Sequence, residues 1–118
     1  MAAFTYNLNI VARCTKMQRT QKFKDLGICG GQAPYLLRLC RSPGMTQEAL
    51  ARALYVNKST AARAINHLEK AGYVERRPSA EDKRCLALYP TDDALEALPQ
   101  IRAAIREWND YLLEGWEA

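Results

Sequence analysis

The middle of the chain constrains its fold more than any other part. Apolar residues recur there at helical spacing in two short runs, and only residues 55–57 separate these runs. Thr46 and Asn57 precede the two runs, and both are residue types that cap a helix by accepting a bond from a backbone N–H group. Gly72 follows the second run, where glycine commonly ends a helix. This pattern predicts two short helices joined by a tight turn, the helix-turn-helix arrangement.

The periodicity changes after Gly72. Residues 73–76 and 85–89 are rich in aromatic and aliphatic types, which predicts two short strands. The segment between them, residues 77–84, is too polar to lie in a core. The pattern predicts a β-hairpin with a charged tip, a wing that follows the helix pair.

Helix-like segments flank this unit. Residues 32–40 predict a short helix that tolerates Pro34 in its first turn. Thr91 is expected to cap a last helix, which Pro99 should kink or interrupt. The predicted fold class is therefore mostly α with a small β-hairpin wing. The segment 4–25 also predicts a helix, with an irregular apolar stripe of Phe4, Leu8, Val11, Ala12, Met17 and Phe23.

Charge is distributed unevenly along the 118 residues, a length that suits one domain. Residues 1–45 contain seven basic residues and one acidic residue, whereas residues 85–118 contain two basic and seven acidic residues. A basic front suits a protein that meets a polyanion on one side. The sequence shows neither a membrane-spanning apolar stretch nor the pattern of a secretory signal. We therefore expect a cytoplasmic protein that does not enter a membrane.

The cysteines and the single histidine favour neither a metal site nor an enzyme. No Cys-x-x-Cys pair occurs, and His67 lies close in sequence to none of the cysteines, so we expect no metal and no other cofactor. The sequence contains no glycine-rich phosphate loop and no Gly-x-Ser-x-Gly motif, which argues against catalysis. His67 is expected to be a boundary residue satisfied by water or by a neighbour. We expect reduced, mostly buried cysteines at Cys14, Cys29, Cys40 and Cys85.

Two motifs carry a resemblance to a known family. The segments "NKSTAARAINHLEKAGYVER" and "SAEDKR" are similar to the recognition helix, first wing strand and Asp-x-Arg wing of the MarR family of multiple-antibiotic-resistance regulators. The resemblance is clear over residues 46–91. It implies a single domain with an N-terminal dimerisation helix over 1–26, a winged helix-turn-helix DNA-binding lobe over 32–91 and a C-terminal dimerisation helix over 92–118. Because members usually continue into a further helix, we expect this last helix to be either naturally short or truncated.

The resemblance also implies a function. Family members are homodimers that bind pseudopalindromic operators in double-stranded DNA, typically as repressors that small phenolic ligands or oxidants release. We therefore expect a sequence-specific DNA-binding transcription regulator with a small aromatic effector. A winged-helix module used only for protein–protein contact is the alternative of another class, but it would not need basic and amide side chains on the second helix of the pair.

That second helix, the recognition helix, is expected to enter the major groove with its N-terminal end. Arg63 can offer two donors to a guanine edge, and Asn66 can pair with adenine. Thr46 and Gln47, at the start of the preceding helix, are expected to contact phosphates. The predicted contacts before the wing are Thr46, Gln47, Asn57, Lys58, Ser59, Thr60, Arg63 and Asn66.

The wing supplies the remaining predicted contacts. Arg84 can insert into a narrow minor groove, where negative potential is concentrated. Asp82 would repel phosphate, and the resemblance implies that it holds an arginine of the recognition helix, for which Arg63 is the candidate. The predicted contacts of the wing are Arg76, Arg77, Asp82, Lys83 and Arg84.

The release step has two candidates. The architecture of the family places a small-molecule effector in a cleft between the dimerisation helices and the lobe. The alternative is a thiol-based redox sensor, because Cys14 lies in a basic stretch that favours its thiolate. Trp108 and Trp116 are expected to be interface or core aromatics. The effector candidates, by position in the family's architecture, are Arg13, Met17, Tyr35 and Leu39.

Overall fold

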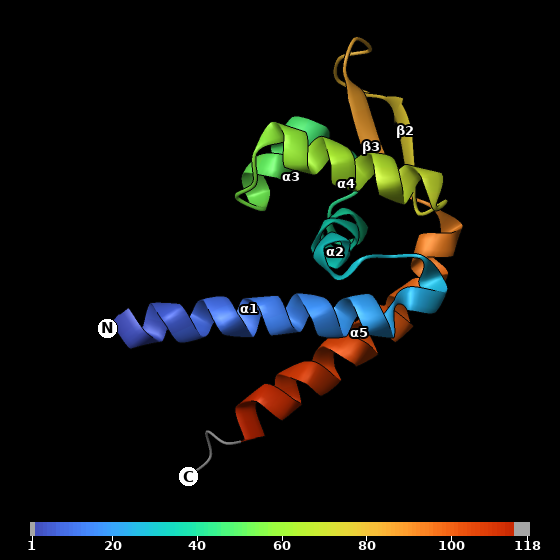
Figure 1. The fold of residues 1–118 in the computed structure, drawn as a ribbon. Helices are drawn as coiled ribbons and strands as arrows, with labels where there is room; N and C mark the ends of the chain where they lie inside the picture. Colours follow the sequence, from blue (N-terminus) through green and yellow to red (C-terminus); the bar gives the residue numbers. More distant parts are fainter. Residues whose placement is uncertain (1, 115–118) are drawn as a thin grey trace.

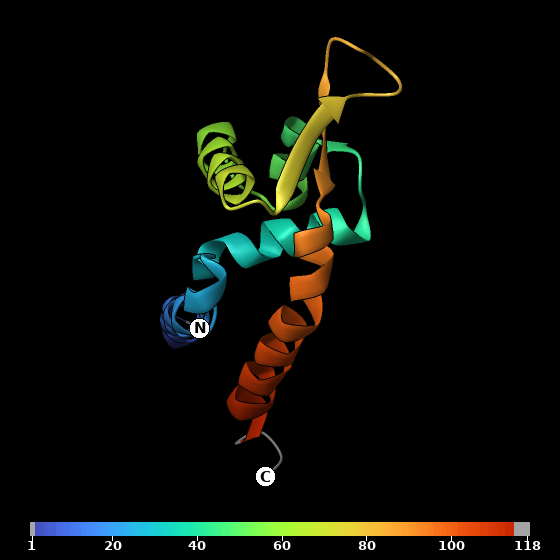
Figure 2. The same ribbon diagram turned by 90° about the vertical axis from the view of Figure 1, so that its right-hand side faces the viewer.

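The structure, a computed structural model, describes residues 2–114, so Trp116 lies outside the described residues. Two long helices, α1 and α5, occupy one end of the molecule, and the wing occupies the other (Figure 1). The helix α2 lies between them, and the same arrangement is seen from the side in Figure 2. The elements are α1 (Ala2–Lys22), the 3-10 turns η1 (Lys24–Leu26) and η2 (Gly30–Gln32), α2 (Ala33–Arg41), β1 (Met45–Thr46), α3 (Gln47–Ala53), α4 (Lys58–Lys70), β2 (Val74–Pro78), β3 (Leu86–Pro90) and α5 (Asp92–Leu113).

The helix caps that the sequence predicts are confirmed. Thr46 Oγ1 accepts a hydrogen bond from the backbone N–H of Ala49 at 3.1 Å, and Asn57 Oδ1 accepts one from Thr60 at 2.8 Å. Gly72 ends α4 with a φ of +88°, a left-handed conformation that favours glycine. The short helix α2 begins with Pro34 in its first turn, also as predicted.

The turn between α3 and α4 contains a non-glycine residue in the left-handed region. Tyr55 has a φ of +57°, and its side chain is 95% exposed. The neighbouring Val56 N–H donates to the carbonyl of Ala51 at 3.0 Å, which closes the turn on α3. Four residues, 54–57, therefore separate α3 from α4, one more than the sequence predicts, and the left-handed position of this turn is filled by tyrosine.

The core gathers around α2. Side chains of every major element of the lobe meet there, and the large ones are fully buried, each contributing roughly 1.5–3 kcal/mol through the hydrophobic effect. This packing fixes α3 and α4 against the base of the wing. The largest fully buried side chains are Phe23, Leu36, Leu39, Leu50, Ile65, Leu68, Leu88 and Ile101.

The wing is a three-stranded sheet in the order β1-β3-β2, whereas the sequence predicted only the hairpin. The third strand is Met45–Thr46, which pairs antiparallel with Leu88 and Ala87 of β3. Two residues are too few for an alternating pattern to reveal a strand. Gly44 leads into it with a φ of +92°, and its N–H donates to the carbonyl of Leu88 at 2.8 Å.

The sequence predicted that Pro99 would kink or interrupt the last helix. Pro99 lies inside α5, which continues past it, so the prediction of an interruption was wrong. The ribbon of α5 instead changes direction in its first half (Figure 1). Proline removes one helical hydrogen bond and bends the helix, and a helix packed against a core tolerates this.

The prediction of mostly buried cysteines was wrong. Cys14, Cys29 and Cys85 are exposed, and only Cys40 is partly buried. Cys14 lies on the exposed surface of α1 and Cys85 in the wing loop just before β3, so neither side chain faces the core.

Of the apolar stripe predicted for residues 4–25, the part that joins the core is Phe23, directly after the end of α1. Phe23 is fully buried, but Phe4 is 65% exposed, Leu8 54% and Met17 71%. The aromatic side chain of Trp108 on α5 is partly buried and stacks on Tyr111, with ring centroids 5.5 Å apart. Among residues 2–114, no helix is both long and apolar enough to cross a membrane.

Candidate nucleic-acid interface

The helix α4 has one face in the core and one open to solvent. Ala61, Ala64, Ile65 and Leu68 are buried, as the sequence predicts, and the opposite face presents Lys58, Ser59, Arg63 and Asn66. Asn57 is already engaged, because its Oδ1 accepts bonds from the Thr60 N–H and from the Ser59 hydroxyl at 3.2 Å. The exposed face of α4 beyond the capping residue Asn57 is therefore small, polar and basic.

Lys58 joins the starts of the two helices. Its Nζ lies 3.0 Å from Oε1 of Glu48, and both side chains are well exposed. The hydrogen bond from Lys58, followed by the charges of Lys58 and Arg52, lowers the pKa of Glu48 below its ordinary value. An exposed pair of this kind is weak, so Lys58 can exchange Glu48 for a phosphate.

Arg76 lies on the face of β2 that meets the helices, and it contacts both of them. Its Nη2 donates to Oδ1 of Asn66 at 2.6 Å and to Oε1 of Gln47 at 3.3 Å. Its Nε lies 3.7 Å from Oε2 of Glu69, and its side chain is only 27% exposed. Arg76 therefore holds α3, α4 and the wing together.

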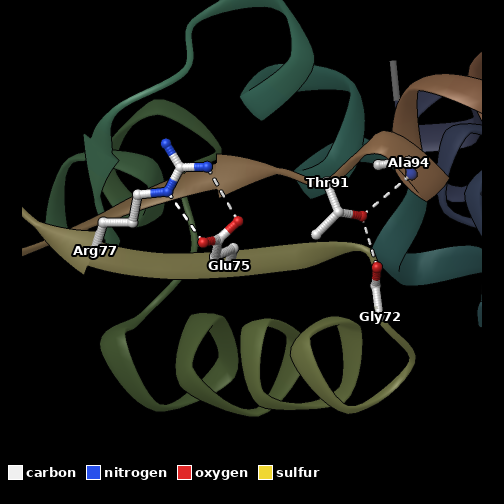
Figure 3. A network of polar contacts seen from close by, with 5 residues as sticks. All are labelled: Gly72, Glu75, Arg77, Thr91 and Ala94. Atoms are coloured by element: carbon white, nitrogen blue, oxygen red, sulfur yellow. Dashed lines mark hydrogen bonds and ion pairs between the residues drawn. The ribbon is translucent and has the colours of Figure 1, made fainter.

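Arg77 points to the opposite face of the sheet, since successive residues of a strand alternate. Its guanidinium donates twice to the carboxylate of Glu75, with both distances at 3.1 Å (Figure 3). It also stacks 4.6 Å from the centre of the Tyr89 ring. The hydrogen bonds and charge of Glu75 raise the pKa of Arg77, and those of Arg77 lower the pKa of Glu75. The structure does not bring Arg77 next to α4.

The wing tip is held by hydrogen bonds to the carboxylate of Asp82. Its Oδ1 accepts a bond from the backbone N–H of Arg84 at 3.0 Å and lies 3.4 Å from Arg84 Nε. These bonds, the backbone one first, lower the pKa of Asp82. The expected contact from Asp82 to Arg63 was wrong, because within residues 2–114 Asp82 has only local partners in the wing tip. The Arg84 side chain remains 94% exposed, and Lys83 is also exposed.

The four effector candidates are not brought together. Tyr35 and Leu39 are core residues, 4% and 0% exposed, whereas Arg13 and Met17 lie on the surface of α1. A cavity that sequence reasoning missed lies instead where η1, the end of α4 and α5 meet, with a volume of about 420 Å³. Its residues come from three separate segments, so no local pattern could reveal it. They are Leu26, Ala71, Tyr73, Asp93, Glu96, Ala97 and Gln100.

Two hydrogen bonds join the lobe to η1 and to the residue that follows it. Tyr73 Oη donates to the carbonyl of Leu26 at 2.6 Å, and His67 Nε2 lies 3.0 Å from the carbonyl oxygen of Gly27. The expectation that a neighbour satisfies His67 is confirmed. Burial, followed by the charge of Asp93, raises the pKa of Tyr73.

Comparison with known proteins gives consistent matches. A family model described as "MarR family" matches residues 26–84. An HTH-type transcriptional regulator of Bacillus subtilis, YybA, is 33% identical over 109 residues, which are 92% of this chain and 73% of that protein. A putative transcriptional regulatory protein for the hcr operon of Thauera aromatica is 33% identical over 67% of this chain and 48% of its own length. The chain thus spans about half to three quarters of these relatives.

Solved structures of similar shape carry related descriptions. A MarR transcriptional regulator from Methanosarcina mazei superposes with a TM-score of 0.93 at 29% identity, covering 100% of this chain and 85% of that one. A putative MarR family transcriptional regulator from Listeria monocytogenes, crystallised with a 26mer DNA, superposes with a TM-score of 0.87 at 31% identity. That match covers 94% of this chain and 74% of the Listeria chain.

Proposed function

The chain belongs to the MarR family of DNA-binding transcription regulators, and we propose that it is a repressor that binds a pseudopalindromic operator as a homodimer until an effector releases it. The observation that carries the proposal is the open face of α4 beside the charged wing tip. Both belong to one packed lobe, so both can meet a single duplex at once. The Listeria relative crystallised with DNA supports this use of the fold.

The proposed contacts follow from exposure. Lys58, Ser59, Arg63 and Asn66 face the major groove, where Arg63 offers a guanidinium fork. Arg84 reaches the minor groove, where negative potential is concentrated. The weaker or supporting contacts are Thr46, Gln47, Asn57, Thr60, Arg76, Arg77, Asp82 and Lys83.

We infer dimerisation through α1 and α5 from the apolar residues that these helices leave uncovered. Phe4 and Leu8 on α1 and Tyr111 and Leu113 on α5 are each more than half exposed. Isolated exposed apolar residues are common, but a series of them along two neighbouring helices marks an interaction surface. A second copy of the chain covers it in a symmetric pair, the commonest arrangement of soluble oligomers.

For the release step we propose a small aromatic effector that enters between α1 and the lobe, beside Arg13 and Met17. Tyr35 and Leu39 are buried in the core and would contact the effector only if the packing around α2 opened. Such a movement would shift the lobes relative to each other and change the DNA affinity.

The exposure of Cys14 favours a second candidate for release, oxidation of its thiol. Cys85 is a poorer candidate, because the charge of Asp82 raises the pKa of its thiol. Peroxide treatment of the purified protein separates the two release mechanisms. Oxidation is excluded if treated and untreated protein bind the same duplex with equal affinity.

The DNA-binding proposal is tested by selecting duplexes from a randomised pool with the purified chain and measuring their affinity at several salt concentrations. We expect log affinity to fall linearly with log salt, because phosphate contacts release counterions. Failure to enrich any duplex, or a flat salt dependence, would contradict DNA binding and favour a protein-interaction module.

A further inference from the structure

Arg76 determines which atoms of two neighbouring amide side chains face outwards. A guanidinium carries only hydrogen-bond donors, so an amide that contacts it must turn its oxygen towards it. Arg76 Nη2 lies 2.6 Å from Oδ1 of Asn66 and 3.3 Å from Oε1 of Gln47. The orientation of both amides follows from chemistry, and the bond to Asn66 is short, as is usual when the donor is charged.

The Asn66 amide nitrogen is left without a partner. Among residues 2–114, the one hydrogen bond of the Asn66 side chain is the bond that its oxygen accepts from Arg76. Asn66 is exposed on the same face of α4 as Arg63, one turn away. The free Nδ2–H₂ group can only donate a hydrogen bond.

This orientation conflicts with the pairing that asparagine makes with adenine. That pairing needs Oδ1 and Nδ2 side by side on the base edge, the oxygen accepting from the adenine amine and the nitrogen donating to N7. In this chain Arg76 turns the oxygen towards β2. The amide nitrogen is then the half of the side chain that has no partner within residues 2–114 and can donate to the groove.

On the basis of the proposed DNA-binding face, we propose that Arg76 is a positioning residue that makes Asn66 a donor-only reader of the major groove. Asn66 then recognises an acceptor on a purine, N7 of either purine or O6 of guanine, and is indifferent to the amine of adenine. Gln47, held in the same way at the start of α3, presents its amide N–H₂ group to a phosphate oxygen. The Nη2 group of Arg76 is engaged within the protein, so Arg76 acts on the groove through Asn66 and Gln47.

The test uses the full chain and its best duplex from the randomised pool. The base pair at which Asn66→Ala relaxes the preference identifies the position that Asn66 reads. Three duplexes are then synthesised that differ only at that position. The first carries adenine, the second carries 7-deazaadenine, which lacks N7, and the third carries the unsubstituted purine base, which lacks the amine of adenine. We expect the 7-deaza duplex to bind about tenfold more weakly, in the range of one base contact, and the purine duplex to bind within about twofold of the adenine duplex.

Variants of Arg76 complete the test. Arg76→Ala frees the amide of Asn66 to turn, so sensitivity to loss of the adenine amine should appear. Arg76→Lys, whose ammonium can still donate to Asn66 Oδ1, should restore the wild-type pattern in part. Arg106→Ala removes the same charge from the exposed surface of α5 and should leave base preference unchanged. If Arg76→Ala does not fold, Asn66→Asp replaces it, because a carboxylate still accepts from Arg76 but has no donor and should abolish the sensitivity to N7.

Three results would overturn the inference while leaving DNA binding intact. The first is wild-type protein that loses affinity when the adenine amine is removed. The second is an Arg76→Ala variant whose slope of log affinity against log salt is smaller by about one counterion, while its base preference is that of the wild type. This is the behaviour of a phosphate contact. The third is an Asn66→Asp variant that still requires N7. Failure of the wild-type chain to bind any duplex would overturn the proposed function as well.

Discussion

The indole nitrogen of Trp108 donates a hydrogen bond of 2.6 Å to the hydroxyl of Thr15, and this bond ties α5 to α1. The Thr15 hydroxyl in turn donates to the carbonyl of Val11, one turn earlier in α1. The two long helices are therefore joined by a specific polar contact as well as by packing.

Replacing Trp108 with phenylalanine should lower the free energy of unfolding by about 1 kcal/mol, because an aromatic ring is kept while the hydrogen bond is lost. Urea denaturation at a fixed protein concentration measures the change, since the proposed dimerisation would make stability depend on concentration. Thr15→Ser, which keeps the hydroxyl, is the matched control. An equal loss in both variants would mean that the hydrogen bond contributes little.

Thr91 should be sensitive to loss of its hydroxyl because it serves two elements. It accepts from the Ala94 N–H at the start of α5 and donates to the carbonyl of Gly72 at 2.6 Å (Figure 3). Thr91→Val keeps the shape and removes both bonds, so we expect a loss of about 1–2 kcal/mol in unfolding free energy. Thr91→Ser should retain most of the stability. If the valine and serine variants have the same free energy of unfolding, the cap is not the stabilising feature.

Arg84→Ala should weaken binding to the selected duplex at least about tenfold without unfolding the protein, since one charged groove contact is worth about 1–3 kcal/mol. Gel-shift titration at fixed salt measures this. Arg77→Ala is the comparison, because it removes the same charge from the sheet face turned away from α4 and should have a smaller effect. Unchanged affinity of the Arg84 variant would remove Arg84 from the interface.

Lys58→Met should raise the pKa of Glu48 towards its ordinary value, because the hydrogen bond from Lys58 is the main cause of the lowered pKa. A carboxylate whose pKa is lower in the folded state stabilises the fold above its unfolded pKa, and this contribution disappears as the pH falls through the folded pKa. The Lys58 variant should therefore lose its stability difference from the wild type in acid. Carboxyl NMR titration measures the pKa directly, and an unchanged Glu48 titration would contradict the pairing.

Phe4→Glu combined with Leu8→Glu should convert the proposed dimer into monomers, because charges would be placed in the apolar surface of α1. Sedimentation analysis over a range of concentrations measures the change. Tyr55→Glu is a matched control, since Tyr55 is even more exposed but lies in the lobe. Dimers that persist in the α1 variant would place the interface elsewhere.

Local chemistry made much of this fold predictable. Thr46, Asn57 and Gly72 act within a few residues of themselves, so their roles could be inferred from residue type and spacing and are confirmed. The strand β1 could not be predicted, because its evidence is a pairing with residues 87 and 88. Side-chain partners were harder still, since distances between separate elements depend on packing. Asp82 was therefore assigned the wrong arginine, and the contacts of Arg76 with α3 and α4 were not foreseen.

The double use of Thr46 has a mechanical consequence. Its hydroxyl caps α3, while its backbone pairs with Ala87 of β3 in the wing. The start of α3 and the wing thus share one residue and cannot move independently. If the protein adapts to operators whose half-sites are spaced differently, the movement must occur between the two lobes of the proposed dimer, along α1 and α5, and the reading geometry within each half-site stays constant.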